Sequence, residues 1–271
     1  MEKITLNNGV QIPIIGLGTY RAKNEDVYNA VKIALRSGYR HIDTAMIYEN
    51  ELDIGRAIKD SGIPRKTLFI TSKLWNADQG YESTKKAFEE SLKKLGTDYL
   101  DMYLIHWHKG EKKAADSWRA MEELYEEGKI KAIGVSNFTE AHIETLLKTA
   151  RINPVVNQVE IHVGLPQYNL KKYCDSKNIK LEAYAPMQSG GIFSNEDMKK
   201  IAIKHNKTVA NIGLKFLVHR GIIVLPKSIT EERIISNKDI FDFSLDEEDL
   251  KLLEKQCNGM RLFPDPDNCS F

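Results

Sequence analysis

Two residues in segment 41–51 have side chains that could act together on one oxygen atom. Asp43 ends a short apolar run typical of a β-strand, and Tyr48 follows five positions later at the start of a helical pattern. A carboxylate and a phenol at this spacing can reach one point only if the chain turns sharply between them. A tyrosine with the ordinary pKa of about 10 is a weak acid at neutral pH, so it needs help to protonate a substrate.

Lys73 and His106 end two further apolar runs and could supply that help. A lysine ammonium beside Tyr48 would lower the pKa of the phenol, and Asp43 would hold Lys73 charged. His106 could donate a hydrogen bond to the same substrate oxygen. The four residues predict a site in which Tyr48 is the general acid for an oxygen that gains negative charge, such as a carbonyl oxygen during hydride transfer. No side chain donates hydride, so this chemistry requires a nicotinamide cofactor.

Other polar and aromatic residues at the ends of the apolar runs suit such a cofactor. Ser136, Asn137 and Gln158 offer hydroxyl and amide groups for a carboxamide. Tyr184 offers a flat ring on which a nicotinamide can stack. The first run delivers Thr19 and Tyr20, which we expect beside the cofactor, and the expected wall of the substrate pocket consists of Tyr20, Trp75 and Trp107.

A second group of polar residues follows the last apolar run. Lys227, Ser228 and Arg233 place two cations and a hydroxyl at the turn into a helix. Phosphate sites of barrel enzymes gather at this turn, near a helix N-terminus. Two cations suit an extra 2′-phosphate, so the sequence favours NADPH over NADH.

The elements that must position these residues alternate along the chain. A hairpin is predicted over residues 4–13, around the turn Asn7-Asn8-Gly9. Eight short apolar runs predict strands at 14–19, 40–45, 68–74, 99–107, 130–135, 155–161, 180–185 and 222–225. Helical patterns lie at 25–37, 50–60, 79–95, 113–127, 139–149, 167–177, 195–220 (two helices) and 230–237. A last helix is predicted at 245–257, and the irregular tail 261–267 should fold back over the body.

Eight strand–helix units in about 250 residues predict a single (β/α)8 TIM barrel that occupies residues 1–271 as one domain. The active site of such a barrel lies at the carboxyl ends of its strands. An open doubly wound sheet is the alternative, and it should carry a Gly-x-Gly-x-x-Gly turn after its first strand. Gly16 and Gly18 begin that motif, but Arg21 stands where the third glycine belongs. We therefore interpret these glycines as a tight strand end.

Composition limits the classes of partner and location. The net charge is +1, from 39 basic and 38 acidic residues, so no global field attracts nucleic acid or an anionic membrane. No apolar run approaches the roughly 18 residues of a membrane span, and no signal peptide is evident. Three scattered cysteines indicate neither a disulfide framework nor a zinc site, so no metal is expected and a cytoplasmic location fits best.

At these residues the chain resembles the aldo/keto reductase family over essentially its whole length. The matching stretches are Asp43–Ala45 with Tyr48 and Asn50-Glu51, then Lys73–Asn76, Leu100–Trp107, Gly134–Phe138, Asn157–Glu160, Ala183–Pro186 and Leu225–Ser228. The resemblance implies a catalytic tetrad of Asp43, Tyr48, Lys73 and His106. It also implies cofactor contacts from Ser136, Asn137, Gln158, Tyr184, Lys227, Ser228, Arg233 and Asn237.

The resemblance further implies ordered binding of extended NADPH, transfer of the 4-pro-R hydride to a small carbonyl substrate, and a monomer. The short loops and the tail look most like the microbial branch, with its 2,5-diketo-gluconate reductases, glyoxal reductases and prostaglandin F synthase-like enzymes. Three positions depart from the family pattern. His108 stands where a proline often follows the His-Trp pair, Ala185 replaces a common serine, and Ser236 replaces a common glutamate.

Three other functions remain open on the residues alone. His106 and His108 alternate at a strand end, as in metal-dependent barrel hydrolases, although later strand ends supply no further histidine or carboxylate ligand. Lys73 could form a Schiff base in a barrel aldolase, although Asp43 would keep it protonated. The barrel could also bind NADPH and regulate a partner, as the potassium-channel β subunits of the resembling family suggest.

Overall fold

The fold is built on a closed parallel sheet, seen in a computed structural model that describes residues 2–269 and 271. Its strands are β3 (Leu17–Gly18), β4 (His41–Asp43), β5 (Phe69–Leu74), β6 (Met102–Ile105), β7 (Ile133–Ser136), β8 (Val156–Glu160), β9 (Lys180–Tyr184) and β10 (Ile223–Val224). They pair in chain order. Bridges from Ile15 to Val224 and from Gly18 to Lys227 join the two edges. The predicted (β/α)8 barrel is confirmed.

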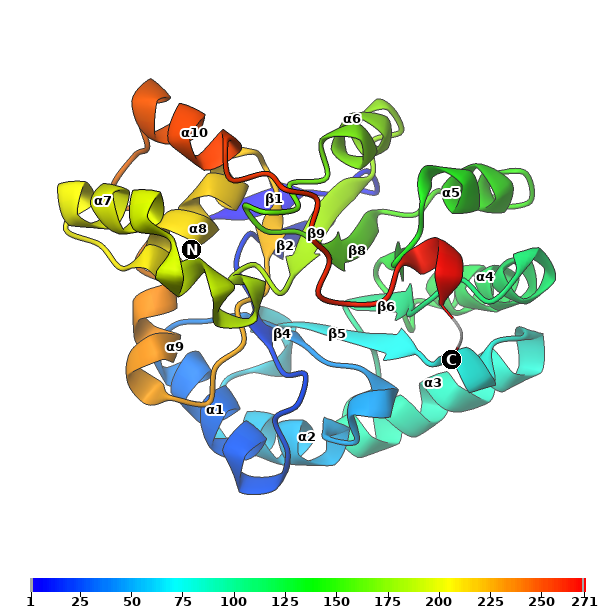
Figure 1. The fold of residues 1–271 in the computed structure, drawn as a ribbon. Coiled ribbons are helices and arrows are strands. Elements are labelled where there is room, and N and C mark those ends of the chain that lie inside the picture. Colours follow the sequence, from blue (N-terminus) through cyan, green and yellow to red (C-terminus); the bar gives the residue numbers. More distant parts are fainter. Residues whose placement is uncertain (1, 270) are drawn as a thin grey trace.

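Helices surround this barrel (Figure 1). They are α1 (Asn24–Arg36), α2 (Glu51–Asp60), α3 (Tyr81–Leu95), α4 (Glu111–Glu126), α5 (Glu140–Leu147), α6 (Tyr168–Ser176), α7 (Glu196–His205), α8 (Val209–His219), α9 (Glu231–Asn237) and α10 (Glu247–Glu254). The predicted pair within 195–220 is α7 and α8, which separate where Asn206 turns left-handed and Thr208 caps α8. No helix in the described part of the chain has the length and apolar character that crossing a membrane requires.

Most predicted strands are longer than the observed ones. The run 99–107, for example, contains β6 over only Met102–Ile105. Residues on both sides of that strand remain buried, because loops and helices cover the ends of the barrel. An apolar pattern reports burial, and it does not distinguish a strand from a buried segment that leads into it. The predicted strand bounds were therefore too wide, while the order of the elements was right.

The barrel has an apolar plug at the end opposite its carboxyl rim. The predicted hairpin forms from β1 (Lys3–Thr5) and β2 (Gln11–Pro13). It contributes Leu6 and Ile12 to a buried cluster inside the barrel whose other members are Phe69, Met102, Leu104, Ala132, Val155, Val156 and Ile223. A larger apolar layer lies between the sheet and the helices. The strands are thus buried on both faces, as parallel strands are in α/β proteins.

The chain after α10 crosses the carboxyl ends of the strands (Figure 1). The backbone N–H groups of Leu262 and Phe263 donate to the two carboxylate oxygens of Glu160, at 2.8 and 3.2 Å. The ring of Phe263 lies 5.2 Å from that of Tyr184, in an edge-to-face arrangement. The prediction that the tail folds back over the body is confirmed, and the tail borders the predicted site.

The contact between α2 and α3 leaves no room for a side chain at Gly55. A Cβ atom there would lie 2.6 Å from the carbonyl oxygen of Leu95, at the end of α3. We expect Gly55→Ala to lower the free energy of unfolding by about 1–3 kcal/mol, because the helices must move apart. Urea unfolding measures this change. Gly191→Ala, where the nearest atoms lie at an ordinary 3.4 Å, is the control. An unchanged or higher stability for Gly55→Ala would contradict the packing described.

Candidate active site

Strand ends bring the four predicted catalytic residues together. Asp43 ends β4, Lys73 lies near the end of β5, and His106 directly follows β6. Tyr48 ends a short 3-10 turn, Met46–Tyr48, that follows β4. The sharp turn inferred from the spacing of Asp43 and Tyr48 is therefore present, at the carboxyl rim where barrel enzymes hold their sites.

The ammonium group of Lys73 is the centre of this group. Lys73 is completely buried, and its Nζ donates to Asp43 Oδ1 at 2.7 Å and to the carbonyl oxygen of Thr44 at 2.8 Å. The Tyr48 hydroxyl lies 3.4 Å from the same nitrogen. A buried charge is costly unless it is paired and hydrogen-bonded. The two short bonds to oxygen satisfy that requirement and leave the third donor directed at the phenol.

The pKa of Tyr48 departs from the sequence expectation. Burial raises it well above the ordinary value, and the charge of Asp43 and the nearby Tyr20 raise it further. The expected lowering of this pKa is not found, because the ammonium of Lys73 is already paired with Asp43 and the burial of the phenol outweighs its effect. Tyr48 is therefore a fully protonated phenol at neutral pH, beside a group that can stabilise its phenolate.

His106 is an uncharged imidazole at neutral pH. Burial and the charge of Lys73 lower its pKa well below the ordinary value. Its ring lies 5.7 Å from the ring of Tyr48 and 5.3 Å from that of Trp75, centre to centre. Nδ1 is sealed from solvent and has no partner among the described residues. The other ring nitrogen, Nε2, is thus the one available to a substrate.

Thr44 and Asn50, to which the sequence assigned no role, hold the turn between Asp43 and Tyr48 together with Thr19. Thr44 donates through Oγ1 to Asn50 Oδ1 at 2.6 Å. The Nδ2 group of Asn50 donates to the carbonyl oxygens of Thr19 and Ala22, at 3.0 and 2.9 Å. Thr19, a predicted cofactor residue, donates through Oγ1 to the carbonyl oxygen of Asp43 at 2.8 Å. These buried bonds fix the path of the chain that carries the phenol.

The residues predicted to meet a carboxamide lie on neighbouring strands: Ser136 ends β7, Asn137 follows it, Gln158 is the central residue of β8, and Tyr184 ends β9. Ser136 Oγ donates to the carbonyl oxygen of Gln158 at 2.9 Å, and Tyr184 donates through its hydroxyl to Asn137 Oδ1 at 2.7 Å. Asn137 donates through Nδ2 to the carbonyl oxygen of His106 at 3.1 Å. Gln158 Nε2 donates to Asp43 Oδ2 at 2.8 Å. Hydrogen bonds thus connect the predicted cofactor residues directly to the tetrad.

The predicted phosphate residues occupy the turn between β10 and α9. Lys227 is exposed and forms a bridge to Gly18 of β3 through its backbone. Ser228 is buried, and its Oγ accepts from the Thr230 N–H at 3.1 Å. Arg233 is exposed on α9, whereas Asn237 at the end of that helix is 3% exposed. The described residues leave both cations without an ion pair, so both are available to an anion.

Aromatic residues border the rim as expected, and the tail adds Phe263 and Phe271. Tyr20 packs its ring 5.1 Å from that of Tyr48. Phe271 stacks on Trp75 at 5.9 Å and meets the edge of Trp107 at 5.3 Å. The carbonyl oxygen of Phe271 accepts hydrogen bonds from Lys109 and Asn76, at 2.6 and 3.1 Å. Phe271 was missed in the sequence because nothing local connects it to residues so far back in the chain.

The three departures from the family pattern have different surroundings. His108 stacks on His142 with 3.9 Å between the ring centres, and burial lowers its pKa to about 4. Ala185 has a left-handed backbone with φ of 50°. Ser236 donates through its hydroxyl to the carbonyl oxygen of Arg233 at 3.3 Å. His108 therefore packs against α5 as an uncharged ring.

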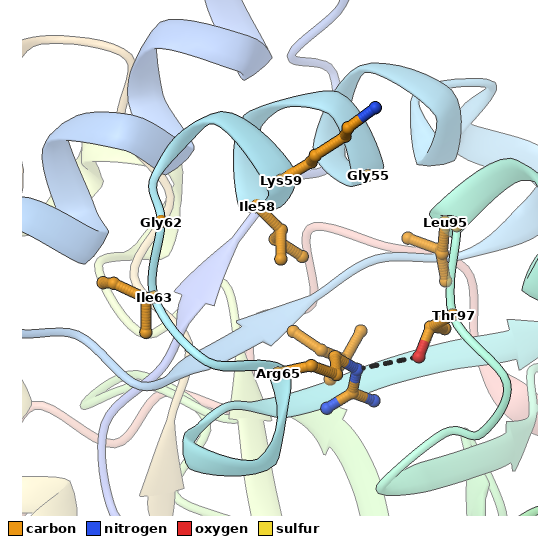
Figure 2. A pocket seen from close by; sticks show the side chains of 10 residues that line it. Gly55, Ile58, Lys59, Gly62, Ile63, Arg65, Leu95 and Thr97 are labelled. Carbon is orange, nitrogen blue, oxygen red and sulfur yellow. Dashed lines mark hydrogen bonds between the residues drawn. The ribbon is translucent and has the colours of Figure 1, made fainter.

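A surface pocket of about 330 Å³ lies at the opposite end of the barrel, between α2 and α3. Figure 2 shows the guanidinium group of Arg65 in it, bonded to the hydroxyl of Thr97. Arg65 also donates to Asp101 Oδ2 at 2.6 Å and to the carbonyl oxygen of Tyr99 at 2.9 Å. Because these bonds occupy the donors of its guanidinium group, Arg65 has a structural role that requires no ligand. Among the described residues, no group of three or more His, Cys, Asp and Glu side chains is placed to hold a metal ion.

Comparison with known proteins agrees with this geometry. The sequence profile described as the Aldo/keto reductase family matches residues 14–257. The chain belongs to the aldo/keto reductase family. As a member of this family, the protein is an oxidoreductase. Glyoxal reductase of Bacillus subtilis (strain 168) is 50% identical to it over 271 residues, which cover 100% of this chain and 98% of that protein.

Solved structures show the same relationship. A crystal structure of an aldo-keto reductase from a Medee basin deep-sea metagenome library matches with a TM-score of 0.97 at 57% identity, and the match covers 99% of this chain and 100% of that one. A Bombyx mori aldo-keto reductase, crystallised in complex with NADP, matches with a TM-score of 0.91 at 35% identity, covering 98% and 96% of the two chains.

The buried ion pair makes a prediction about the stability of this reductase. Asp43→Asn leaves the Lys73 ammonium buried without its carboxylate, so we expect the free energy of unfolding to fall by about 3–5 kcal/mol. Asp43→Asn combined with Lys73→Met removes both charges and should cost less. Urea unfolding at neutral pH measures both.

The matched control is the exposed pair of Lys23 and Glu49, 2.8 Å apart. Glu49→Gln should leave the free energy of unfolding nearly unchanged, because water screens this exposed pair. If the double variant Asp43→Asn with Lys73→Met is as unstable as Asp43→Asn alone, the unpaired charge of Lys73 is not the cause of the lost stability.

Proposed function

We propose that the protein reduces aldehydes and ketones to alcohols with NADPH as the hydride donor, and that residues 1–271 form one catalytic domain. The observation that carries this proposal is the meeting of four groups at the carboxyl rim. A buried ammonium of Lys73 bonds to Asp43 at 2.7 Å and lies 3.4 Å from the Tyr48 hydroxyl, with an uncharged His106 beside the phenol. This arrangement suits the protonation of an oxygen that is becoming an anion.

The residues divide the work on the carbonyl group. His106 Nε2 donates a hydrogen bond to the substrate oxygen and fixes its direction. Tyr48 supplies the proton, since a developing alkoxide is a stronger base than a phenolate. Lys73 then stabilises the phenolate that remains, and Asp43 keeps Lys73 charged and in place. The raised pKa of Tyr48 ensures that the proton is present before the reaction begins.

The residues around the tetrad fit a nicotinamide dinucleotide. When bound, the reduced nicotinamide supplies the hydride. Ser136, Asn137 and Gln158 would hold its carboxamide, and Tyr184 would lie against its ring. The phosphate groups would meet Lys227, Ser228 and Arg233, with Asn237 nearer the adenine, and Thr19 and Tyr20 would border the nicotinamide end. The NADP bound to the Bombyx mori relative supports this assignment.

Small carbonyl compounds are the proposed substrates. Tyr20, Trp75 and Trp107 would form an apolar wall beside the reacting oxygen, and the relative named glyoxal reductase supports a dicarbonyl as one substrate. We further propose a cytoplasmic monomer, in line with the balanced charge and the scattered cysteines. A regulatory barrel would bind NADPH without turnover. An aldolase would instead be trapped on Lys73 when borohydride is added with substrate.

The role of Tyr48 is tested by Tyr48→Phe. We expect turnover of phenylglyoxal to fall by about 10²–10⁴-fold, because the proton donor is lost, while NADPH still binds. Absorbance of NADPH follows turnover, and quenching of tryptophan fluorescence follows binding. Tyr103→Phe is the control, since this tyrosine is buried on the neighbouring β6 and its hydroxyl has no partner among the described residues. Unchanged turnover in Tyr48→Phe would remove Tyr48 from the mechanism.

Preference for NADPH is tested by Lys227→Ala. The change should weaken NADPH binding roughly tenfold, because a charge-assisted bond to the 2′-phosphate is lost, and should affect NADH much less. Dissociation constants of both cofactors come from fluorescence titration. Lys255→Ala removes an exposed lysine at the end of α10 and should change neither constant. Equal losses for NADPH and NADH in Lys227→Ala would show that Lys227 does not contact the 2′-phosphate.

A further inference from the structure

A carboxyl group that the mechanism does not use is buried in the barrel beside the site. Glu182 lies at the centre of β9, directly opposite Gln158 of β8 in the strand register. Its side chain is fully buried. Its nearest basic group is His41 Nε2 at 3.8 Å, and burial lowers the pKa of His41 to about 3, so His41 is uncharged. Within the described part of the chain, no lysine or arginine pairs with Glu182. Burying a carboxyl group here costs free energy unless hydrogen bonds offset the loss of its hydration.

Among the described residues, the side chain of Glu182 forms one hydrogen bond, which comes from Gln158. Gln158 Nε2 donates to Glu182 Oε2 at 2.7 Å and to Asp43 Oδ2 at 2.8 Å. Both N–H groups of the amide are therefore used. A rotated amide would point its oxygen at two carboxyl groups, and Asp43 is the partner of the Lys73 ammonium. The two carboxyl groups together allow only one orientation of the Gln158 amide.

This orientation leaves the amide oxygen of Gln158 as the group presented to a ligand. Gln158 Oε1 accepts no hydrogen bond from the described residues. It is also not sealed from solvent. An amide oxygen points away from its own nitrogen, so Oε1 is directed away from Asp43 and Glu182. The site therefore presents an acceptor at this position, together with hydroxyl and amide groups from Ser136 and Asn137.

We propose that Glu182 is a positioning residue, which with Asp43 fixes the Gln158 amide so that its oxygen accepts a hydrogen bond from the carboxamide NH2 of the nicotinamide. The proposal rests on the proposed function and adds a basis for cofactor recognition. A carboxamide carries both an N–H donor and a carbonyl acceptor. A fixed acceptor at Gln158 selects one orientation of the carboxamide, which in turn fixes the ring face from which hydride leaves.

Glu182 can accept from Gln158 in the observed arrangement in both protonation states. Burial and the nearby Asp43 raise the pKa of its carboxyl group above the ordinary value. A protonated carboxyl group keeps one acceptor oxygen for Gln158 Nε2, but its O–H can also donate, so the ionised form of Glu182 excludes the rotated amide more strictly.

A cofactor analogue tests the proposal. The acetylpyridine analogue of NADPH carries a methyl group where the carboxamide has NH2, so it offers no donor to Gln158 Oε1. Wild-type protein should prefer NADPH over the analogue, in binding and in kcat/KM. Glu182→Met keeps the length of the side chain and removes the acceptor. Only Asp43 then opposes rotation of the Gln158 amide, so the rotated form, which donates to the acetyl oxygen, becomes more populated and the preference should fall roughly tenfold.

Two further variants separate positioning from structural support. Glu182→Gln retains an oxygen that accepts from Gln158 and should restore most of the preference. Glu51→Gln is the matched control: Glu51 is another buried carboxylate, on α2, and it accepts from Ser72 Oγ at 2.6 Å with no bond to Gln158. Glu51→Gln should leave the preference unchanged even if it lowers stability. If Glu182→Met does not fold, Glu182→Ala takes its place.

The outcomes distinguish this proposal from the proposed function. If wild-type protein reduces carbonyls with NADPH but Glu182→Met loses activity equally with both cofactors, Glu182 is structural and the proposal is overturned. If wild-type protein shows no turnover, the proposed function fails, and the preference is still measured by binding NADP and its acetylpyridine analogue. An unchanged ratio of dissociation constants in Glu182→Met overturns the proposal there as well.

Discussion

A single buried ion pair constrains the rest of this structure. The Lys73 ammonium is withdrawn completely from water and bonds to Asp43 at 2.7 Å. The desolvation of two charges is expensive, and it is offset only when every remaining donor and acceptor is satisfied. The carbonyl oxygen of Thr44 and the amide of Gln158 supply the additional bonds to the pair. The chain around the pair is accordingly arranged to hold these oxygens and nitrogens in place.

The closed barrel is what makes that arrangement possible. Neighbouring parallel strands deliver Asp43, Lys73 and His106 to one rim, and a turn held by Asn50 returns Tyr48 to the same point. The hairpin plug fills the far end of the barrel with apolar side chains. From Asp43, hydrogen bonds continue through Gln158 to Glu182, so the proton donor and the proposed cofactor contacts belong to one network.

The sequence predicted the barrel and the catalytic tetrad because ionisable residues stand at the ends of apolar runs. Asp43, Lys73 and His106 stood out in this way, and the alternation of runs predicted the barrel that brings them together. Glu182 was missed because it lies inside a run, although its even spacing from Tyr184 places both on one strand face. The sequence predicted a lowered pKa for Tyr48, whereas burial raises it, and burial depends on the folded surroundings. The contact of Phe271 with Trp75 joins residues far apart in the chain, and no local pattern reports it.

The account is tested most directly by following the hydride itself. NADPH carrying deuterium at the 4-pro-R position would be mixed with the protein and with phenylglyoxal, methylglyoxal or nitrobenzaldehyde, and the products analysed by mass spectrometry. The account predicts an alcohol with one deuterium on the former carbonyl carbon, formed as NADPH is consumed. NADPH that binds tightly but transfers no deuterium to any of these carbonyl compounds would contradict it and would favour the regulatory barrel.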